Sequence, residues 1–597
     1  MAGLEIGSVS IERGFWKDRI EAGRRAGIPS YLEVLEKHGV LDNFRRISGR
    51  SRAERSGPVH RDSDLYKWME AAAYSLQRRP DRQLEERLEA VIEDVVAAQG
   101  RDGYLNTYFV EERADERFSN LERDHELYCA GHLMQAAVAH YRATGRRKLL
   151  DCATRFADYL LSVFGPGRRR GFSGHPELEM AMVEMYRATG RREYLDFAGY
   201  LLEQLDFAGR REMEGHAVRA CYACCGGADY FAETGEEEIW GALTALWKDM
   251  SRYRVYITGG VGSRYVGESF GERYELPNLR AYAETCAAVA NVMWSWRMLL
   301  LTGESEYADM MERVLYNGFL SGVSLSGDRY FYVNPLESSG RGDGWGHERK
   351  EWYSTPCCLG NVQRTLASLP GYVYGRDETG IWINLYHSST LETRSGGSRV
   401  EIGQETGYPW SGEVRISVRS EPPREFALRA RIPAWSVDTH AEVGGETLDP
   451  EPGTYLEIRR EWGAGGTVQL RFGMPVRLVE AHPRVREDYG AVAISRGPLI
   501  YCVESVDNPG IRVRNLMIDR DAEPRYEFMP DLLGGVGTVV FRGIEVPDGG
   551  PLYAPLGRMA LEHEAVDVRA IPYYAWANRG RSSMLVWIPY RSNSPEE

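Results

Sequence analysis

A repeated segment in the first half of the chain is the feature that most constrains its fold. Residues 141–147 read YRATGRR, residues 186–192 read YRATGRR again, and a Thr-Gly echo follows at 234–235 and 302–303. Each copy follows one helical stretch with periodic apolar residues and precedes another, and its glycine stands where a helix C-cap needs a left-handed residue. The two full copies start 45 residues apart, which indicates recurring helical hairpins.

Hairpins of this kind, continued over roughly 370 residues, can stack as an open solenoid or close into a ring of inner and outer helices. We favour closure into an (α/α)6 barrel over residues 1–374, the predicted catalytic domain. The reason is that the polar and aromatic motifs described below fall at hairpin ends, where one mouth of a closed ring would gather them.

After about residue 374 the pattern changes to short runs that alternate or are continuously apolar between Gly, Pro and Asp turns. Such runs are typical of β-strands. They occupy 381–386, 414–418, 426–432, 467–472 and 490–494. The sequence therefore predicts an all-β sandwich domain over 375–478 and a second one over 479–597.

Composition limits the classes of function. A chain of 597 residues is too long for one hydrophobic core. Its formal net charge of -14 argues against nucleic acid, because a protein that follows phosphates needs a basic face. The 14 Trp and 35 Tyr residues are a weak indication of a carbohydrate-stacking cleft.

Residues 1–8 show neither a basic segment nor a continuous apolar stretch of the kind found in secretory signals. No apolar run approaches the ~18 residues needed to span a bilayer. The nine cysteines are an odd number scattered through a large chain, so reduced thiols are the better interpretation than a disulfide framework. We therefore expect a cytoplasmic protein that uses no membrane partner.

Two adjacent cysteines are the main chemical feature of the sequence. Cys357 and Cys358 precede a run that reads as helical, and Glu284 with Cys286 would complete the four ligands of a tetrahedral Zn²⁺. A spacing of two does not place Glu284 and Cys286 on one helix face, so both reach one ion only from a loop or a frayed first turn. The residues alone leave open a catalytic zinc, a structural zinc, and small buried thiols without metal.

Glu268 lies in a glycine-rich loop at 259–271. Glycines on both sides of it suggest a loop whose backbone approaches a ligand, with a carboxyl group free to reach a substrate oxygen. The alternative is a solvated loop glutamate. A second thiol cluster, Cys221, Cys224 and Cys225, lies among small residues, and we interpret it as close helix packing without metal.

Four histidines lie near hairpin ends. His125 and His132 are seven residues apart, hence on one face if the run between them is a helix, while His175 and His216 each follow a glycine and precede later helices. Any single one can be a core histidine. Together they predict a rim that binds sugar hydroxyls.

At these residues the sequence resembles glycoside hydrolase family 127, the β-L-arabinofuranosidase family. The resemblance runs through nearly the whole chain. The motifs that carry it are 62–64 (DSD) with Lys67-Trp68, 99–108 (QGRDGYLNTY), 125–132, 256–260 (YITGG), 267–270 (GESF), 284–286 (ETC), Cys357-Cys358, 431–435 (RIPAW) and 495–499 (SRGPL).

The resemblance implies an (α/α)6 barrel with β-sandwich domains after it, and a zinc ion held by Glu284, Cys286, Cys357 and Cys358. It further implies that Cys357 is the nucleophile of a retaining hydrolysis and Glu268 the acid/base. The expected activity is release of L-arabinofuranose, or a closely related sugar, from the non-reducing end of β-linked arabinofuranosides.

The resemblance also implies that His125, His175 and His216 hold the sugar hydroxyls, and similar enzymes form homodimers. This chain departs from better-known members, which tend to carry a cysteine two residues before the nucleophile and prolines after the pair. Here Thr355 stands before, and Leu359 and Gly360 follow. These positions are expected to shape the pocket floor and hence the choice of sugar.

Two other classes stay open at this point. One is an (α/α)6 polysaccharide lyase or sugar epimerase that uses His125, His216 or a tyrosine as proton carrier and keeps zinc structural. It predicts activity that survives loss of Cys357 but not of a histidine. The other is a carbohydrate-binding protein with a decayed active site, which the presence of both Glu268 and Cys357 disfavours.

Overall fold

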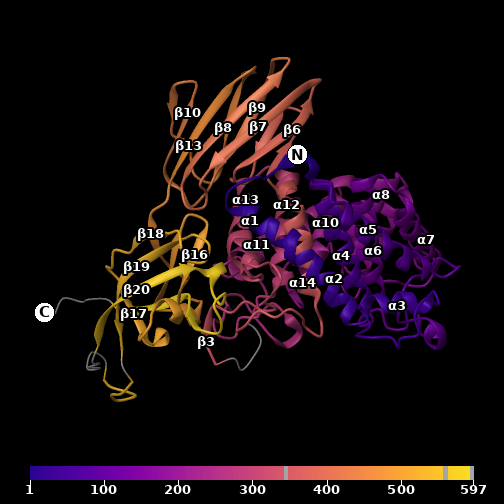
Figure 1. The fold of residues 1–597 in the computed structure, drawn as a ribbon, viewed down its shortest axis with the longest axis horizontal. Coiled ribbons are helices and arrows are strands. Elements are labelled where there is room, and N and C mark those ends of the chain that lie inside the picture. The colour runs from indigo at the N-terminus through magenta and orange to yellow at the C-terminus, as the bar shows by residue number, and fades with distance from the viewer. Residues whose placement is uncertain (342–346, 547, 556–562, 592–597) are drawn as a thin grey trace.

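The chain folds into a helical part followed by two β-rich parts, as a computed structural model describes it for residues 1–597 except 342–346, 547, 556–562 and 592–597. In Figure 1 the helical part runs from indigo to magenta, the middle β part is orange and the C-terminal β part is yellow. The predicted order, helices first and strands after, is confirmed. No helix among the described residues has the length and apolarity needed to cross a bilayer.

α-Helices account for about half of the first 370 residues. They are α1 (Phe15–Ala22), α2 (Ile28–Lys37), α3 (Val40–Ile47), α4 (Asp62–Arg78), α5 (Arg82–Ala97), α6 (Glu126–Thr144), α7 (Lys148–Val163), α8 (Leu178–Thr189), α9 (Arg192–Gln204), α10 (Ala217–Thr234), α11 (Glu237–Tyr253), α12 (Thr285–Thr302), α13 (Ser305–Val314) and α14 (Cys357–Ser368).

The repeated glycines end helices as predicted. Gly145, Gly190, Gly235 and Gly303 are the C-caps of α6, α8, α10 and α12, with φ between 68° and 74°. Each donates its backbone N–H to the carbonyl four residues earlier, at 2.8 Å. The left-handed conformation suits glycine, which lacks a Cβ, and it turns the chain into the next, outer helix of each hairpin.

Six of the helices contact one another in a closed cycle: α4 with α6, then α8, α10, α12, α14 and back to α4. The helices α5, α7, α9, α11 and α13 pack against this cycle from outside. The inner helix α6 is buried almost all round, whereas the outer helix α7 buries one face. This difference is what a helix between two layers and a helix at the surface should show.

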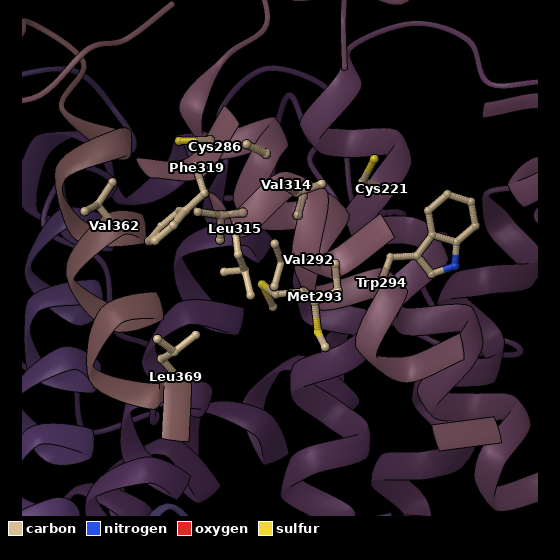
Figure 2. Packing of buried hydrophobic residues seen from close by; sticks show 14 of the residues in the cluster. Cys221, Cys286, Val292, Met293, Trp294, Val314, Leu315, Phe319, Val362 and Leu369 are labelled. Carbon is tan, nitrogen blue, oxygen red and sulfur yellow. The ribbon is translucent and has the colours of Figure 1, made fainter. Parts of the chain in front are cut away.

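Glycines and apolar side chains allow the inner helices to approach closely. A Cβ at Gly131 of α6 would lie 2.7 Å from the side chain of Glu177, beside the start of α8. Between α12, α13 and α14 the core contains Met293, Val314 and Val362, with Cys286 at its margin (Figure 2). Cys221, Cys224 and Cys225 of α10 are buried, consistent with the packing role predicted for them.

The strands form three sheets among the described residues. They are β1 (Ala2–Gly3), β2 (Val9–Ser10), β3 (Glu337–Ser339), β4 (Tyr374–Arg376), β5 (Gly380–Ile383), β6 (Ser389–Ser395), β7 (Ser398–Thr406), β8 (Glu413–Glu421), β9 (Arg424–Ile432), β10 (Val437–Val443), β11 (Glu446–Leu448), β12 (Thr454–Trp462), β13 (Gly466–Gly473), β14 (Val476–Glu480), β15 (Ala491–Arg496), β16 (Leu499–Glu504), β17 (Leu516–Asp519), β18 (Arg525–Met529), β19 (Val536–Glu545), β20 (Glu564–Pro572), β21 (Ser583–Leu585) and β22 (Trp587–Arg591).

The middle part contains a five-stranded sheet, β1-β4-β5-β9-β12, and a seven-stranded sheet, β11-β10-β13-β8-β7-β6-β2. The C-terminal part is one large sheet in the order β14-β15-β22-β17-β19-β20-β16-β21-β3, with β18 paired to β19. Strand β8 alternates exposed and buried residues along its whole length. That is the period-2 pattern from which the strands were predicted.

The helical and β parts share strands. The N-terminal strands β1 and β2 pair with β4 and β6 of the middle part, and β3 pairs with β21 of the C-terminal part. Residues within 1–374 therefore contribute to all three sheets, while the predicted divisions after residues 374 and 478 stay predictions. Arg431 of β9, fully buried, forms an ion pair at 2.5 Å with Glu312 of α13 and fixes the middle part against the ring.

Candidate active site

The N-terminal ends of the inner helices meet at one mouth of the ring. His60 and His175 precede α4 and α8, His125 and His216 are the N-caps of α6 and α10, and the cysteine pair opens α14. The gathering of polar motifs at one mouth is thus confirmed. With Glu284, the N-cap of α12, six helix N-termini meet at this mouth, and their dipoles favour negative charge there.

A cavity of about 610 Å³ occupies this mouth. Its lining residues are His60, His125, Tyr128, His175, His216, Val218, Arg219, Tyr265, Gly267, Glu268, Glu284, Cys286, Tyr332, Thr355, Cys357 and Asn361.

Glu284 and the three cysteines form one compact cluster. Cys357 Sγ lies 3.5 Å from Glu284 Oε1 and 3.9 Å from Cys358 Sγ, and Cys286 Sγ lies 3.3 Å from Cys358 Sγ. The spacing of two between Glu284 and Cys286 is no obstacle, because Glu284 is the N-cap of α12 with an extended ψ of 139°. The cap and the first turn of α12 therefore both face the start of α14.

The donor set of this cluster fits a metal ion. One ligand atom from each residue lies within 4.8 Å of all the others, and three of the four residues are buried. Glu284 Oε2 is buried and has no hydrogen-bond partner among the described residues. Three thiols and a carboxyl group are ligands that suit a tetrahedral ion, and a cation would offset the cost of burying them together. The cluster could hold a metal such as zinc.

The protonation of the cluster is uneven. Hydrogen bonds from Cys286 and Cys358 hold the pKa of Cys357 well below its ordinary value. Burial raises the pKa of Glu284, Cys286 and Cys358 well above theirs. Cys357 is thus the member best able to carry negative charge, and it is also the cysteine that is only partly buried.

Glu268 is not a freely solvated loop residue. Its Oε2 lies 2.8 Å from Nε2 of His216, and its side chain is 34% exposed. The loop is held in place because the backbone of Ser269 forms isolated β-bridges with both His216 and Arg264. Glu268 has a φ of 52°, next to Gly267 at 70°, so the backbone turns there and directs the carboxyl group into the cavity.

His216, Glu268 and Glu284 also lie close enough to share an ion. The tautomer of His216 argues against it. Its Nδ1 accepts the backbone N–H of Val218 at 3.2 Å, which places the proton of the neutral ring on Nε2, facing Glu268. A metal ligand at Nε2 would instead need the proton on Nδ1. The arrangement therefore suits a hydrogen-bonded acid/base pair better than a second metal site.

Three of the four predicted histidines line the cavity. The rings of His125 and His175 are 5.6 Å apart, and those of His175 and His216 are 5.4 Å apart. Burial lowers the pKa of His125 to about 4 and that of His175 well below its ordinary value. Neutral rings have one donor and one acceptor each, as hydroxyl binding requires.

His132 does not reach the cavity. It is fully buried, with its ring 4.5 Å from Tyr128 and its Nδ1 3.2 Å from Glu177 Oε1. The predicted shared helix face with His125 is wrong, because His125 precedes α6 as a cap with a φ of 57°. The structure gives no support to the rim role predicted for His132.

Several cavity residues were missed in the sequence. The hydroxyl of Tyr332 lies 3.6 Å from Cys357 Sγ, and the hydroxyl of Tyr128 accepts a 2.7 Å hydrogen bond from the buried Lys67. His60 could have been found, since it stands directly before a helix like the other histidines. Thr355 lines the cavity, whereas Leu359 and Gly360 are buried and are not among its lining residues.

Family models match the chain in three consecutive stretches. Residues 8–371 match the β-L-arabinofuranosidase GH127 catalytic domain, 380–474 the β-L-arabinofuranosidase GH127 middle domain, and 476–589 the glycoside hydrolase family 127 C-terminal domain. The matches together cover most of the chain.

Individual relatives agree over the full length. A curated protein from Bifidobacterium longum subsp. longum, named non-reducing end β-L-arabinofuranosidase, is 35% identical over 97% of this chain and 99% of its own. The crystal structure of a GH127 β-L-arabinofuranosidase from Geobacillus stearothermophilus T6 is 39% identical, with a TM-score of 0.94 over 98% of this chain and all of that chain. A GH127 β-arabinofuranosidase structure, BT3674, is 36% identical, with a TM-score of 0.92 over 99% of this chain and 98% of that chain.

Proposed function

The chain belongs to glycoside hydrolase family 127, and on that premise we propose that it releases L-arabinofuranose, or a closely related sugar, from β-linked arabinofuranosides with retention of configuration. We assign Cys357 as nucleophile and Glu268 as acid/base. The closed cycle of six inner helices, with outer helices packed around it, supports an (α/α)6 barrel as the finer description of the helical part.

The observation that carries the proposal is that Cys357 and Glu268 line one cavity, together with Glu284 and three histidines. A retaining hydrolase needs a nucleophile below the sugar and an acid/base beside the departing oxygen. The cavity offers a thiol with a depressed pKa and a carboxyl group hydrogen-bonded to His216, each reachable from the same small volume.

Glu284, Cys286, Cys357 and Cys358 would hold the zinc ion. When bound, Zn²⁺ would keep the thiol groups that coordinate it deprotonated near neutral pH. The position of Cys357 at the first residue of α14 acts in the same direction, because a helix N-terminus stabilises an adjacent negative charge.

In the first step the sulfur of Cys357 attacks the anomeric carbon and forms a C–S bond while the glycosidic C–O bond breaks. The carboxyl group of Glu268 gives its proton to the departing oxygen, so the leaving group departs as a neutral alcohol. In the second step the Glu268 carboxylate takes a proton from water, whose oxygen displaces the sulfur. Two inversions give net retention.

The rings of His125 and His175, with His216 beside them, would bind the sugar hydroxyls from within the same cavity. His216 has a second task, because its Nε2–H also meets Glu268. Tyr332, 3.6 Å from Cys357 Sγ, can donate a hydrogen bond to the thiolate before attack.

The test is hydrolysis of 4-nitrophenyl β-L-arabinofuranoside by zinc-loaded, reduced enzyme, with the first product anomer followed by NMR. We expect turnover with retention in the wild type and none in Cys357→Ala. Cys152→Ala, a buried thiol on the outer helix α7, is the matched control and should keep its activity.

Turnover that persists in Cys357→Ala would overturn the cysteine mechanism. Turnover with inversion would overturn the covalent intermediate. A zinc-containing wild type that cleaves other glycosides but not this one would retain the mechanism and change the sugar.

A further inference from the structure

Arg219 is an arginine of the cavity without a partner. It lies in the first turn of α10, three residues after the cap His216, and its side chain is partly buried. Nε of Arg219 is buried and has no hydrogen-bond partner among the described residues, and no carboxylate there lies within ion-pair distance of the guanidinium. Burial lowers its pKa.

Two other arginines buried inside the ring have carboxylate partners. Arg364 meets Glu70 at 2.9 Å, and Arg297 meets Asp229 at 2.7 Å. The difference matters because a desolvated guanidinium with open donor positions costs free energy that a bound ligand can recover. Arg219, by contrast, is a donor group of the cavity lining whose buried Nε has no acceptor among the described residues.

Arg219 lines the same cavity as Glu268 and interacts with it electrostatically. The carboxylates that act on it electrostatically are Glu268 and Glu122, and Glu122 is exposed at the surface. Tyr265, a lining residue in the same loop as Glu268, is 42% exposed. Arg219 is thus a neighbour of both the proposed acid/base and an exposed surface carboxylate.

We propose that Arg219 forms the leaving-group subsite and binds acceptor oxygens, hydroxyl or carboxylate, on the sugar that is released as the alcohol. The inference rests on the proposed function. Because Cys357 takes the anomeric carbon and Glu268 protonates the departing oxygen, the leaving group must extend from Glu268 away from the cysteine cluster. That direction leads toward Arg219 and the cavity mouth.

The geometry of the side chain suits this role. A guanidinium presents several N–H donors in one plane and can engage two adjacent oxygens at once, as vicinal hydroxyls or a carboxylate provide. Its donors are available in the free enzyme, so binding a leaving group need not break an existing ion pair. A phenyl leaving group offers no such acceptors and would gain nothing from Arg219.

The experiment compares three β-L-arabinofuranosides whose leaving groups are phenol, a neutral sugar and a uronic acid, with release of arabinose as the readout. Arg219→Met keeps much of the alkyl stem and removes the donors, Arg219→Lys keeps the charge, and Arg280→Met is a control at an exposed arginine outside the cavity lining. Thermal unfolding confirms that each variant is folded.

We expect Arg219→Met to lower kcat/KM about 10- to 100-fold for both disaccharides, the range for a lost hydrogen bond to a charged group, and to change the phenyl substrate little. A wild-type preference for the uronate leaving group, partly retained by Arg219→Lys, identifies a carboxylate as the acceptor. Equal rates on the two disaccharides identify hydroxyls.

An equal loss on all three substrates would overturn the inference, since Arg219 would then act through Glu268 or through folding. No loss on any of them would overturn it as well. If the wild type releases no arabinose from the phenyl substrate, the proposed function fails. In that case the affinities of wild type and Arg219→Met for methyl glucuronide and methyl β-L-arabinopyranoside, measured by calorimetry, test the subsite. Equal affinities of the two proteins would count against it.

Discussion

Nε2 of His216 lies 2.8 Å from Oε2 of Glu268, while Nδ1 of the same ring accepts the backbone N–H of Val218 at the start of α10. The helix cap therefore fixes the tautomer of the histidine, and the tautomer directs an N–H at the carboxyl group. The His216 side chain thus accepts a hydrogen bond from an otherwise unpaired backbone N–H of the first turn of α10. It also holds the proposed acid/base in the cavity.

Loss of His216 should impair acid assistance in particular. We expect His216→Ala to lower kcat/KM about 10- to 100-fold for a sugar leaving group, the range for residues that orient a functional side chain. The loss should shrink for a dinitrophenyl leaving group, which departs without a proton. Steady-state rates on both substrates check this. His216→Gln, which keeps an amide donor, should recover part of the loss, and an equal loss on both substrates would speak against the positioning role.

Metal content should depend on the four clustered residues. We expect about one zinc per chain in the wild type, measured by mass spectrometry after dialysis, and its loss in Cys358→Ala and Glu284→Gln. A strong chelator should lower the unfolding temperature of the wild type, because an ion that binds only the folded state stabilises it. Cys225→Ala, a buried thiol of the other cluster, should retain the metal. Zinc that remains in Cys358→Ala would refute the assigned ligand set.

The carboxyl group of Glu177 should make stability depend on pH. Burial raises its pKa to about 8 from an ordinary 4.5. Neither of its oxygens has a hydrogen-bond partner among the described residues, although Nδ1 of His132 lies 3.2 Å from Oε1. Between these two pKa values the folded state keeps a proton that the unfolded state has released. The free energy of unfolding should therefore fall as pH rises through this window, by up to about 1.4 kcal/mol per pH unit, and level off above it.

Glu177→Gln keeps the shape and removes the titration. Urea unfolding at pH 5, 6.5 and 8 should show a smaller decline for this variant than for the wild type. Glu378→Gln, at an exposed glutamate, should follow the wild type. Identical pH slopes for Glu177→Gln and wild type would show that the carboxyl group titrates normally.

Local features of the fold were predictable from the sequence because their signals are local. The Thr-Gly repeats predicted helix ends at Gly145 and Gly190, since a left-handed C-cap is encoded within one turn. The alternation of apolar and polar residues predicted β8 for the same reason, because it too is encoded within a few neighbouring residues. The pairing of β1 with β4 joins residues more than 370 apart, and nothing in the two residues of β1 indicates its partner.

The site was predictable in membership more than in geometry. Glu284 and Cys286 looked ill-spaced as joint ligands because the extended ψ of Glu284 at the helix cap has no mark in the sequence. The contact between His216 and Glu268 depends on how a loop returns to a helix cap 52 residues earlier. His132 was misplaced because His125 lies just outside the helix in a left-handed conformation, so the helical spacing of seven does not apply to the pair.

Close approach of α6 and α8 should make Gly131 intolerant of any side chain. A Cβ there would lie 2.7 Å from Glu177 Cγ and 2.9 Å from two backbone atoms, Glu177 C and Leu178 N. Backbone cannot rotate away as a flexible side chain can, so the helices must separate, and we expect Gly131→Ala to lower the free energy of unfolding by about 1 to 3 kcal/mol. Gly241→Ala, on the exposed outer helix α11 with open space around the new methyl, should instead stabilise by about 0.5 to 1 kcal/mol. Because His175 lies just before α8, the separation should also raise KM. Urea unfolding of both variants checks the opposite signs, and stabilisation by Gly131→Ala would show that the ring is looser than these contacts imply.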